Sequence, residues 1–216
     1  MGYKVLGWDA SGPSLSVGLI DDGRVVADIT WARPRLAGSH LVSWIDQLVR
    51  EFGRPDGLAV GVGPGSFTGV RVAVTAAKAY AAIWGVPVKG VSSLAAWARG
   101  VAPPAYVVVT SERRGSAFYL GYYWVGPGGA EPLIPDTAIN GALPEGFPLT
   151  REVVVLGPAA EDAQWLSRIG RQARPGQAIL SGGQVALTAW PAVQWGESDD
   201  PLTLAPAYLR PPAASV

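Results

Sequence analysis

The sequence of 216 residues contains no cysteine and a single histidine, His40. The absence of thiols excludes disulfide bonds, thiolate zinc sites and a cysteine nucleophile, and one imidazole cannot form a histidine metal cluster. We therefore expect no bound metal. Secreted domains of this size usually carry disulfide bonds, so a chain without cysteine is more typical of the cytoplasm.

Charge is also scarce, and the two signs balance. Charged residues make up 16% of the chain, against about 25% in an average soluble domain, and 17 lysines and arginines match 17 acidic residues. A net charge of zero gives no long-range attraction to nucleic acid or to an anionic membrane, so any role on nucleic acid would be shared with another subunit. The low charge also indicates that a partner covers part of the surface.

Long uninterrupted apolar runs are missing as well. The most apolar stretch, residues 70–88, is interrupted by Arg71, Lys78, Gly85 and Pro87, so it predicts a helix that ends in a turn rather than a membrane span. The N-terminal residues lack a charged leader followed by a long apolar core, so we expect no signal peptide. These patterns predict a soluble α/β protein that does not bind a membrane.

The periodicity of apolar residues divides the chain into two similar halves. The first half has the order βββαβαβα, with strands at residues 3–8, 14–20, 24–31, 58–62 and 86–90 and helices at 41–52, 70–84 and 92–99. The second half resembles a reduced copy, with strands at 106–110, 116–124 and 152–156, a helix at 159–169, and a loop with short edge strands at 126–148. We place an N-terminal domain at residues 1–101 and a smaller, degenerate domain at 102–216.

A glycine-rich loop at residues 63–69 connects a buried strand to the second long helix. It contains no lysine and so is not a Walker loop, and Thr68 stands where a dinucleotide fingerprint needs its third glycine. Free N–H groups at the start of a helix suit an anion, but a cap formed by Ser66 or Thr68 is the commoner role. We interpret the loop as structural, formed by Gly63, Pro64, Gly65, Ser66, Thr68 and Gly69.

The helix at residues 70–84 is apolar nearly all round, which is typical of a helix buried on more than one side. Ala73, Ala77 and Ala81 form a ridge of small side chains at a spacing of four residues. The second cover is either this domain itself or another subunit, and the small number of elements in this half favours a subunit interface. The predicted interface comprises Leu41, Ile45, Phe67, Val70, Arg71, Ala73, Val74, Ala77, Lys78 and Ala81.

The nine residues Gly-Pro-Gly-Ser-Phe-Thr-Gly-Val-Arg at 63–71 closely resemble the signature of the bacterial TsaB family, formerly called YeaZ. Leu6-Gly-Trp-Asp-Ala-Ser-Gly resembles the family's opening strand and aspartate turn, Gly90-Val-Ser-Ser-Leu follows the second helix as expected, and Pro206-Ala-Tyr-Leu-Arg resembles the C-terminal signature. This family belongs to the actin-like ATPase superfamily. The resemblance therefore implies an actin-like, RNase H-like α/β fold of two related βββαβαβα subdomains, the second one reduced.

Two positions depart from the family's pattern. Ala37 stands where the family often has a histidine at the start of its first long helix, and His40 lies three positions later. Residues 111–114 read Ser-Glu-Arg-Arg in place of the usual Asp-Ala-Arg-Arg. We interpret the pair Arg113–Arg114 as part of a solvated loop, with a contact to tRNA or to a partner as the alternative.

No residue of the chain combines the features of a catalytic group. Active members of the superfamily hold an aspartate near the phosphates or metal at the position that Asp9 occupies. A turn-capping role is favoured here, because Asp9 lies in a Ser/Gly/Pro cluster and no second acid follows at a suitable spacing. Ser66 as a nucleophile would need a base, and only His40 is available, so the old glycoprotease label finds no triad. We predict no catalytic residue and no cofactor.

The resemblance implies a non-catalytic subunit of the complex that adds a threonylcarbamoyl group to N6 of the adenosine beside the tRNA anticodon. In that family TsaD binds metal and performs the transfer, and TsaE is an ATPase. This chain would form a heterodimer with TsaD and activate it, and would reach tRNA only through the complex; when isolated it could be a monomer or a homodimer. The alternative is an independent actin-fold enzyme, a small-molecule kinase that uses ATP.

Overall fold

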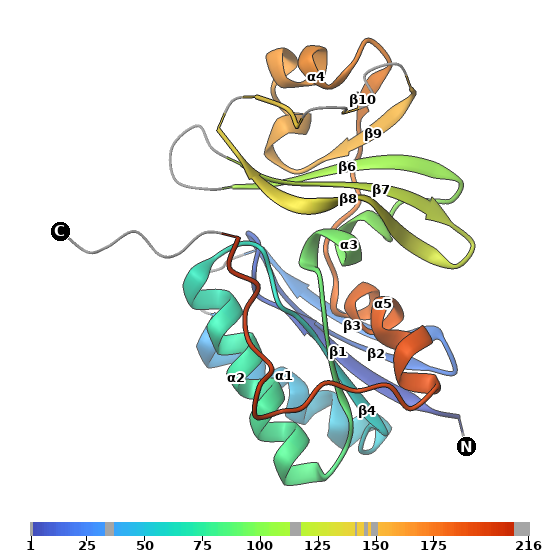
Figure 1. Ribbon diagram of the computed structural model, residues 1–216. Coiled ribbons are helices and arrows are strands. Elements are labelled where there is room, and N and C mark those ends of the chain that lie inside the picture. The colour runs from blue at the N-terminus through green and yellow to red at the C-terminus, as the bar shows by residue number, and fades with distance from the viewer. Residues whose placement is uncertain are drawn as a thin grey trace, which may run out of the picture.

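The structure, a computed structural model, describes residues 2–32, 37–112, 118–140, 142–144, 147 and 151–209, with only the backbone described at 37–39 and 112. The predictions on Arg113, Arg114 and Arg210 lie outside these residues. Two five-stranded sheets make up the fold, one below the other in Figure 1. Within the described ranges, no helix is long and apolar enough to cross a membrane.

The first sheet has the order β3-β2-β1-β4-β5. Its strands are β1 (Lys4–Asp9), β2 (Leu15–Asp21), β3 (Arg24–Trp31), β4 (Gly57–Gly61) and β5 (Val88–Val91). The first three strands are antiparallel, and β4 and β5 run parallel to β1. Asp22 and Gly23 form the predicted hairpin turn, and both have positive φ, of 45° and 72°.

Helices α1 (Ala37–Phe52) and α2 (Phe67–Trp84) cover one face of the first sheet, side by side in Figure 1. The apolar side chains that the helical period aligned, among them Leu41, Ile45, Ala73 and Ala77, pack there against the strands in one core. The indole N–H of Trp8 on β1 donates a 3.0 Å hydrogen bond to the carbonyl of Ala73, and this bond is buried. The core of the first half therefore lies between this helix pair and the sheet.

The second sheet repeats the first one, as the sequence predicted. Its strands are β6 (Ala105–Glu112), β7 (Phe118–Gly126), β8 (Gly129–Ile139), β9 (Val153–Leu156) and β10 (Ala173–Pro175). They have the order β8-β7-β6-β9-β10 with the same strand directions as the first sheet. The predicted helix at 159–169 divides into the short 3-10 helix η2 (Pro158–Ala160) and α4 (Ala163–Ile169). Between β8 and β9 the described residues contain no counterpart of α1, and Tyr122, Phe147 and Trp165 pack over that face.

The two halves exchange one helix each. The short helix α3 (Ser93–Ala98) follows the first sheet but packs on the second, where Leu94 contacts the core that contains Val107 and Tyr123. Conversely, α5 (Gly182–Gln194) follows the second sheet but covers the free face of the first (Figure 1). The domain boundary near residue 101 stays a prediction.

After α5 the chain runs back along the first half, in a segment from Trp195 to Leu209 that we call the C-terminal strap (Figure 1). Asp199 pairs with the edge strand β5, since its backbone N–H donates to the carbonyl of Val88 at 2.8 Å and its carboxylate accepts from the N–H of Gly90. Farther on, the Lys78 ammonium of α2 donates to the carbonyls of Leu202 and Leu204 at 3.1 and 3.3 Å. The strap is thereby fixed along α2.

Candidate functional site

Asp9 ends β1, and both oxygens of its carboxylate accept hydrogen bonds from within the chain. The residue is 1% exposed. One oxygen accepts hydrogen bonds from the Ser11 backbone N–H and hydroxyl at 2.6 and 2.7 Å, and the other accepts from the Ser93 hydroxyl at the start of α3. A Cβ at Gly61 would lie 1.7 Å from the second oxygen, so glycine is required beside this carboxylate.

Burial raises the pKa of Asp9 above its ordinary value, and the hydrogen bonds from Ser93 and Ser11 oppose this shift only in part. The charged form is therefore disfavoured in the folded protein. The two bonds that Asp9 accepts from the backbone N–H and the hydroxyl of Ser11 have the geometry of a turn cap.

The loop at residues 63–69 fits closely against the Asp9 turn. A Cβ at Gly65 would lie 2.2 Å from the Ser11 carbonyl, and one at Gly69 would lie 1.9 Å from the carbonyl of Ala10. The hydroxyl of Ser66 accepts from the N–H of Gly69 at 3.2 Å, so Ser66 caps α2. The two glycines are needed for this backbone contact, which fills the space beside the loop.

The adjacent serines at the start of α3 join the two halves. The hydroxyl of Ser93 donates to Asp9, whereas that of Ser92 donates to Asp136 of β8 at 2.5 Å and caps α3. Asp136 also accepts a hydrogen bond from the hydroxyl of Tyr123. Burial raises the pKa of Asp136, and burial with the nearby Asp136 carboxylate raises that of Tyr123. The sequence does not predict this cluster, because no residue next to Asp136 or Tyr123 in the chain indicates that the two side chains bond to each other.

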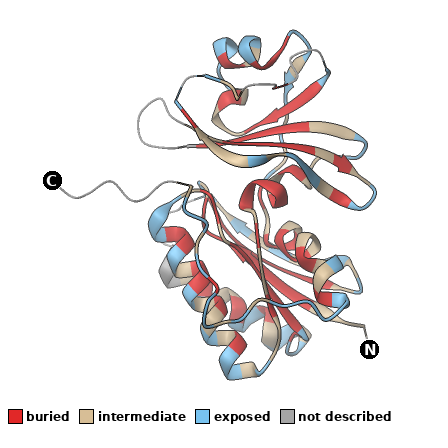
Figure 2. Cartoon of the chain, in the orientation of Figure 1, coloured by how far each residue is buried: buried red, intermediate tan, exposed pale blue. Residues whose placement is uncertain are grey.

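Seven of the ten residues predicted to line a partner interface are buried in the chain's own first core: Leu41, Ile45, Val70, Ala73, Val74, Ala77 and Ala81. The prediction that the alanine ridge faces a partner is therefore wrong. The alanine ridge is covered by other parts of the same chain. Apolar side chains of α1, of the first sheet and of the strap residue Leu204 pack in one core with it. Phe67 and Arg71 are exposed and Lys78 is half-buried, so the outward side of α2 remains accessible (Figure 2).

The remaining candidates have structural roles. The ring of His40 packs against Trp31 and Trp44 with centroid separations of 4.6 and 6.0 Å, and the Ser66 hydroxyl is used in the α2 cap. Among the residues that the structure describes, no group of three or more histidine, aspartate or glutamate side chains could hold a metal ion.

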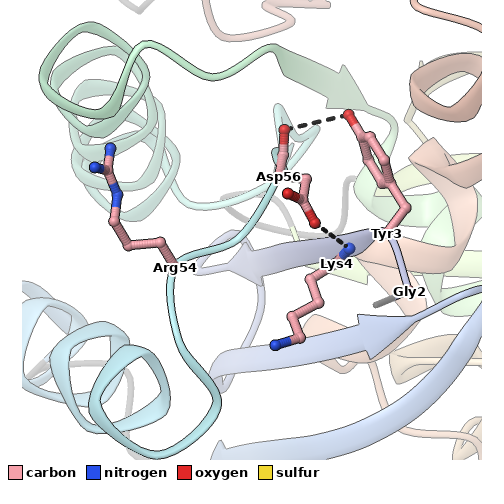
Figure 3. A pocket seen from close by; sticks show the side chains of 5 residues that line it. All are labelled: Gly2, Tyr3, Lys4, Arg54 and Asp56. Atoms are coloured by element: carbon pink, nitrogen blue, oxygen red, sulfur yellow. Dashed lines mark hydrogen bonds between the residues drawn. The ribbon is translucent and has the colours of Figure 1, made fainter.

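A cavity of about 260 Å³ lies at the opposite end of β1 and β4, lined by Gly2, Tyr3, Lys4, Arg54 and Asp56 (Figure 3). Its two cations are engaged at helix ends: Lys4 donates to the carbonyl of Phe52, the last residue of α1, and Arg54 donates to that of Trp84, the last residue of α2. Cations stabilise the C-terminal ends of helices in this way. Both cations that line the cavity are therefore used in helix capping.

The chain is similar in sequence to proteins of tRNA modification. A family model described as TsaD: tRNA N6-adenosine threonylcarbamoyltransferase matches residues 35–142. An uncharacterized protein of Mycobacterium tuberculosis is 31% identical over 223 residues, which cover 97% of this chain and 93% of that protein. The tRNA threonylcarbamoyladenosine biosynthesis protein TsaB of Bacillus subtilis is 31% identical over 145 residues, which cover 61% of this chain and 60% of that protein.

The fold is shared with a solved structure over nearly the whole length. YeaZ from Pseudomonas aeruginosa matches with a TM-score of 0.81 at 24% identity, over 96% of this chain and 100% of that chain. Together with the repeated strand order of the two sheets, this match confirms the predicted actin-like α/β fold with a reduced second half.

Proposed function

Because the chain belongs to the TsaB (YeaZ) family, we propose that it takes part in the biosynthesis of threonylcarbamoyladenosine in tRNA, as a non-catalytic subunit in the cytoplasm. In this proposal the chain pairs with the catalytic subunit TsaD and holds it in a competent state, works together with TsaE, and reaches tRNA only through the complex.

The observation that carries the non-catalytic role is the state of Asp9. Its two oxygens accept three hydrogen bonds from Ser11 and Ser93, and the residue is buried. These bonds use the carboxylate within the turn, and the close backbone contacts of Gly65 and Gly69 hold the adjoining loop against that turn. Both features support a structural use of the position that active relatives use for chemistry.

Pairing through the outward side of α2 is supported by what that side presents. Phe67 and Arg71 are exposed in the first turns of α2, and Ile83 near its end is 75% exposed. Exposed aromatic and arginine side chains are the types that most often dominate binding energy at protein interfaces. The proposed interface therefore uses this side of α2 and not the buried alanine ridge.

Reconstitution tests the proposal. TsaD, TsaE, an enzyme that supplies threonylcarbamoyl-adenylate and tRNA are assayed for the modified adenosine with and without this chain. We expect formation of the product to depend on the chain, and Asp9→Asn to support it as well as the wild type does. Turnover by the chain alone that Asp9→Asn abolishes would refute the non-catalytic role.

A second measurement addresses the alternative of an ATP-dependent small-molecule kinase. Calorimetry of the isolated chain with ATP and Mg²⁺ should give no tight binding, because the Asp9 oxygens and the loop at 63–69 are already engaged. Tight binding that Asp9→Asn weakens would favour the kinase.

A further inference from the structure

The two adjacent serines at the start of α3 hold carboxylates from different halves of the chain. Ser92 caps α3, and its hydroxyl donates to Asp136 of β8 at 2.5 Å. Ser93 is the first residue of the helix, and its hydroxyl donates to Asp9 of β1 at 2.5 Å. The helix lies between the two sheets in Figure 1 and contacts α5 as well as β6, β7 and β8. A single peptide bond therefore separates the attachment to the first sheet from the attachment to the second.

Ser93 also holds the first residue of the glycine loop that precedes α2. The N–H of Gly63 donates to the Ser93 hydroxyl at 3.0 Å, and the N–H of Ser93 donates to the carbonyl of Gly63 at 2.9 Å. Farther along the loop, the N–H of Ser66 donates to the carbonyl of Ser11 at 2.7 Å, and Ser11 is bonded to Asp9. Both attachments of the loop thus lead back to Asp9, and the loop fixes where α2 begins.

Ser92, in turn, is fixed by the second sheet. Asp136 accepts from the hydroxyls of Ser92 and of Tyr123, and Tyr123 is 1% exposed in the core that α3 shares with the second sheet. A Cβ at Gly121 would lie 2.8 Å from the Asp136 carboxylate, so glycine leaves the space that this carboxylate fills. Ser92 therefore cannot move relative to the second sheet unless its bond to Asp136 breaks.

The core under α2 contains no described side chain of the second sheet. Its described members come from the first sheet and the segments that flank it, from α1 and α2, and from Leu204 of the strap. The second half is instead connected to the start of α2 by the bonds from Asp136 to Ser92 and from Ser93 to Gly63. Because a peptide bond is planar and stiff, a displacement of Ser92 displaces Ser93 as well.

We infer that the second half positions the start of α2 through Asp136, Ser92 and Ser93. The inference rests on the proposed function, in which the outward side of α2 faces the catalytic subunit, and it gives the second half a part in that pairing. Asp136 and Ser92 are positioning residues, because they act on the loop through Ser93 and belong to no proposed contact with the partner. If these bonds only hold the second half in place, the loop keeps its geometry without them.

Amide hydrogen exchange of the full chain tests the connection. Asp136→Ala should raise the exchange rates of the Gly63 and Ser66 N–H groups by about tenfold relative to those of β2 and β3, because the loop loses support equivalent to about one hydrogen bond. Ser92→Gly removes the other partner of the same bond at a position where glycine is tolerated as a cap, and it should raise the same rates. Unchanged rates in both variants would overturn the inference.

Two further variants separate positioning from a general loss of stability. Asp162→Ala is the matched control, since it removes another carboxylate that caps a helix of the second half, α4, and should leave the loop unchanged. Asp136→Asn should restore wild-type rates, because its amide oxygen can still accept from the Ser92 hydroxyl. An equal rise in Asp162→Ala would show that any loosening of the second half reaches the loop, and would refute the specific connection.

Titration calorimetry with the catalytic subunit tests whether the partner depends on this positioning. Asp136→Ala should weaken binding by about two- to thirtyfold, the range typical of residues that modulate a site without touching it, and Asp162→Ala should bind as the wild type does. Ser93→Ala combined with Asp136→Ala should lose less affinity than the sum of the single losses in free energy, because both act on the same loop. Fully additive losses would refute the path through Ser93.

The failures of the two proposals are distinguishable. If the wild type does not bind the catalytic subunit, the proposed function fails, while the exchange rates still decide whether the second half positions the loop. If the wild type binds and Asp136→Ala matches it in both exchange and affinity, the inference is refuted and the proposed function stands. Faster exchange with unchanged affinity would show that the positioning ends at the loop, and would refute its part in the pairing.

Discussion

Substituting Ala77 with a charged residue tests whether this position lies in the core of the chain or in an interface with a partner. Ala77 lies in the middle of α2, is 0% exposed, and packs in the first core with Val74 and Ile45. In Ala77→Glu the new carboxyl group would lie among the apolar side chains of this core, with no cation among its described members. The protonated, neutral form would therefore be favoured. Protonating a glutamate with an ordinary pKa of about 4.3 at about pH 7 costs about 4 kcal/mol.

The larger side chain adds a second penalty. Overpacking a close-packed core costs about 1–3 kcal/mol, so the total is about 5–7 kcal/mol, comparable with the whole free energy of unfolding of an ordinary domain, about 5–15 kcal/mol. We expect a sharply lowered melting temperature and aggregated protein. Thermal unfolding followed by circular dichroism, with sizing by light scattering, measures both effects.

The matched control is Ala79→Glu, two residues farther along the same helix at an exposed position. It should change the free energy of unfolding by no more than about 0.5 kcal/mol. A folded Ala77→Glu protein that melts like Ala79→Glu but no longer associates with a partner would refute the reasoning, because the ridge would then face that partner.

Three further predictions concern the contact of α5 with the first sheet, the pKa of Asp9 and the affinity for tRNA. Gly18→Ala would place a Cβ 2.3 Å from the backbone nitrogen of Gly183 in α5, so we expect the free energy of unfolding, measured with denaturant, to fall by about 1–3 kcal/mol. The control Gly128→Ala has no atom within 4 Å of the added Cβ and should be neutral. Equal denaturation midpoints for the two variants would contradict the α5 contact. Because burial raises the pKa of Asp9, its contribution to stability is complete below the unfolded pKa and is lost as the pH rises through the folded value. The melting temperature of Asp9→Asn relative to the wild type should therefore increase between about pH 4 and about pH 7, and a decrease would show that the folded protein favours the carboxylate. The isolated chain, with a net charge of zero, should bind tRNA only weakly in filter binding, and a tight, steeply salt-dependent affinity would count against this expectation.

The strands of the first sheet could be predicted to within a few residues, because their alternation is local and strong. The sequence predicts that α2 starts at residue 70, three residues too late. In the structure Ser66 caps the helix and Phe67 is its first residue. The helical period also grouped Ala73, Ala77 and Ala81 correctly on one face. It could not tell what covers that face, because Leu204 of the core comes from more than a hundred residues away.

Two elements of the second half contradict local signals. The helix α5 begins with Gly-Gly and contains Pro191, which both argue against a helix. Gly182 is required there because a Cβ would lie 2.1 Å from the backbone nitrogen of Gly18, and a Cβ at Gly183 would lie 2.6 Å from the Asp28 carboxylate, so distant contacts override the local preference. Similarly, the sequence predicts a loop with short edge strands at 126–148, whereas β8 is one edge strand of 11 residues, in which the prolines are tolerated because it lies at the edge. The Asp136–Tyr123 contact joins two strands and has no local signal.

The exchange of helices also determines when the first sheet can be completed during synthesis on the ribosome. Strands β1 to β3 emerge first, but α5 begins at Gly182, roughly 150 residues after the end of β3. At a synthesis rate of about 5–20 residues per second, α5 is made roughly 8–30 s after β3. During this time the apolar side chains of Val5 and Ile20, which α5 buries in the folded protein, stay uncovered. We therefore expect a chaperone that recognises exposed apolar strands to bind a nascent chain arrested before residue 182. The same chaperone should bind weakly once α5 has packed on the first sheet.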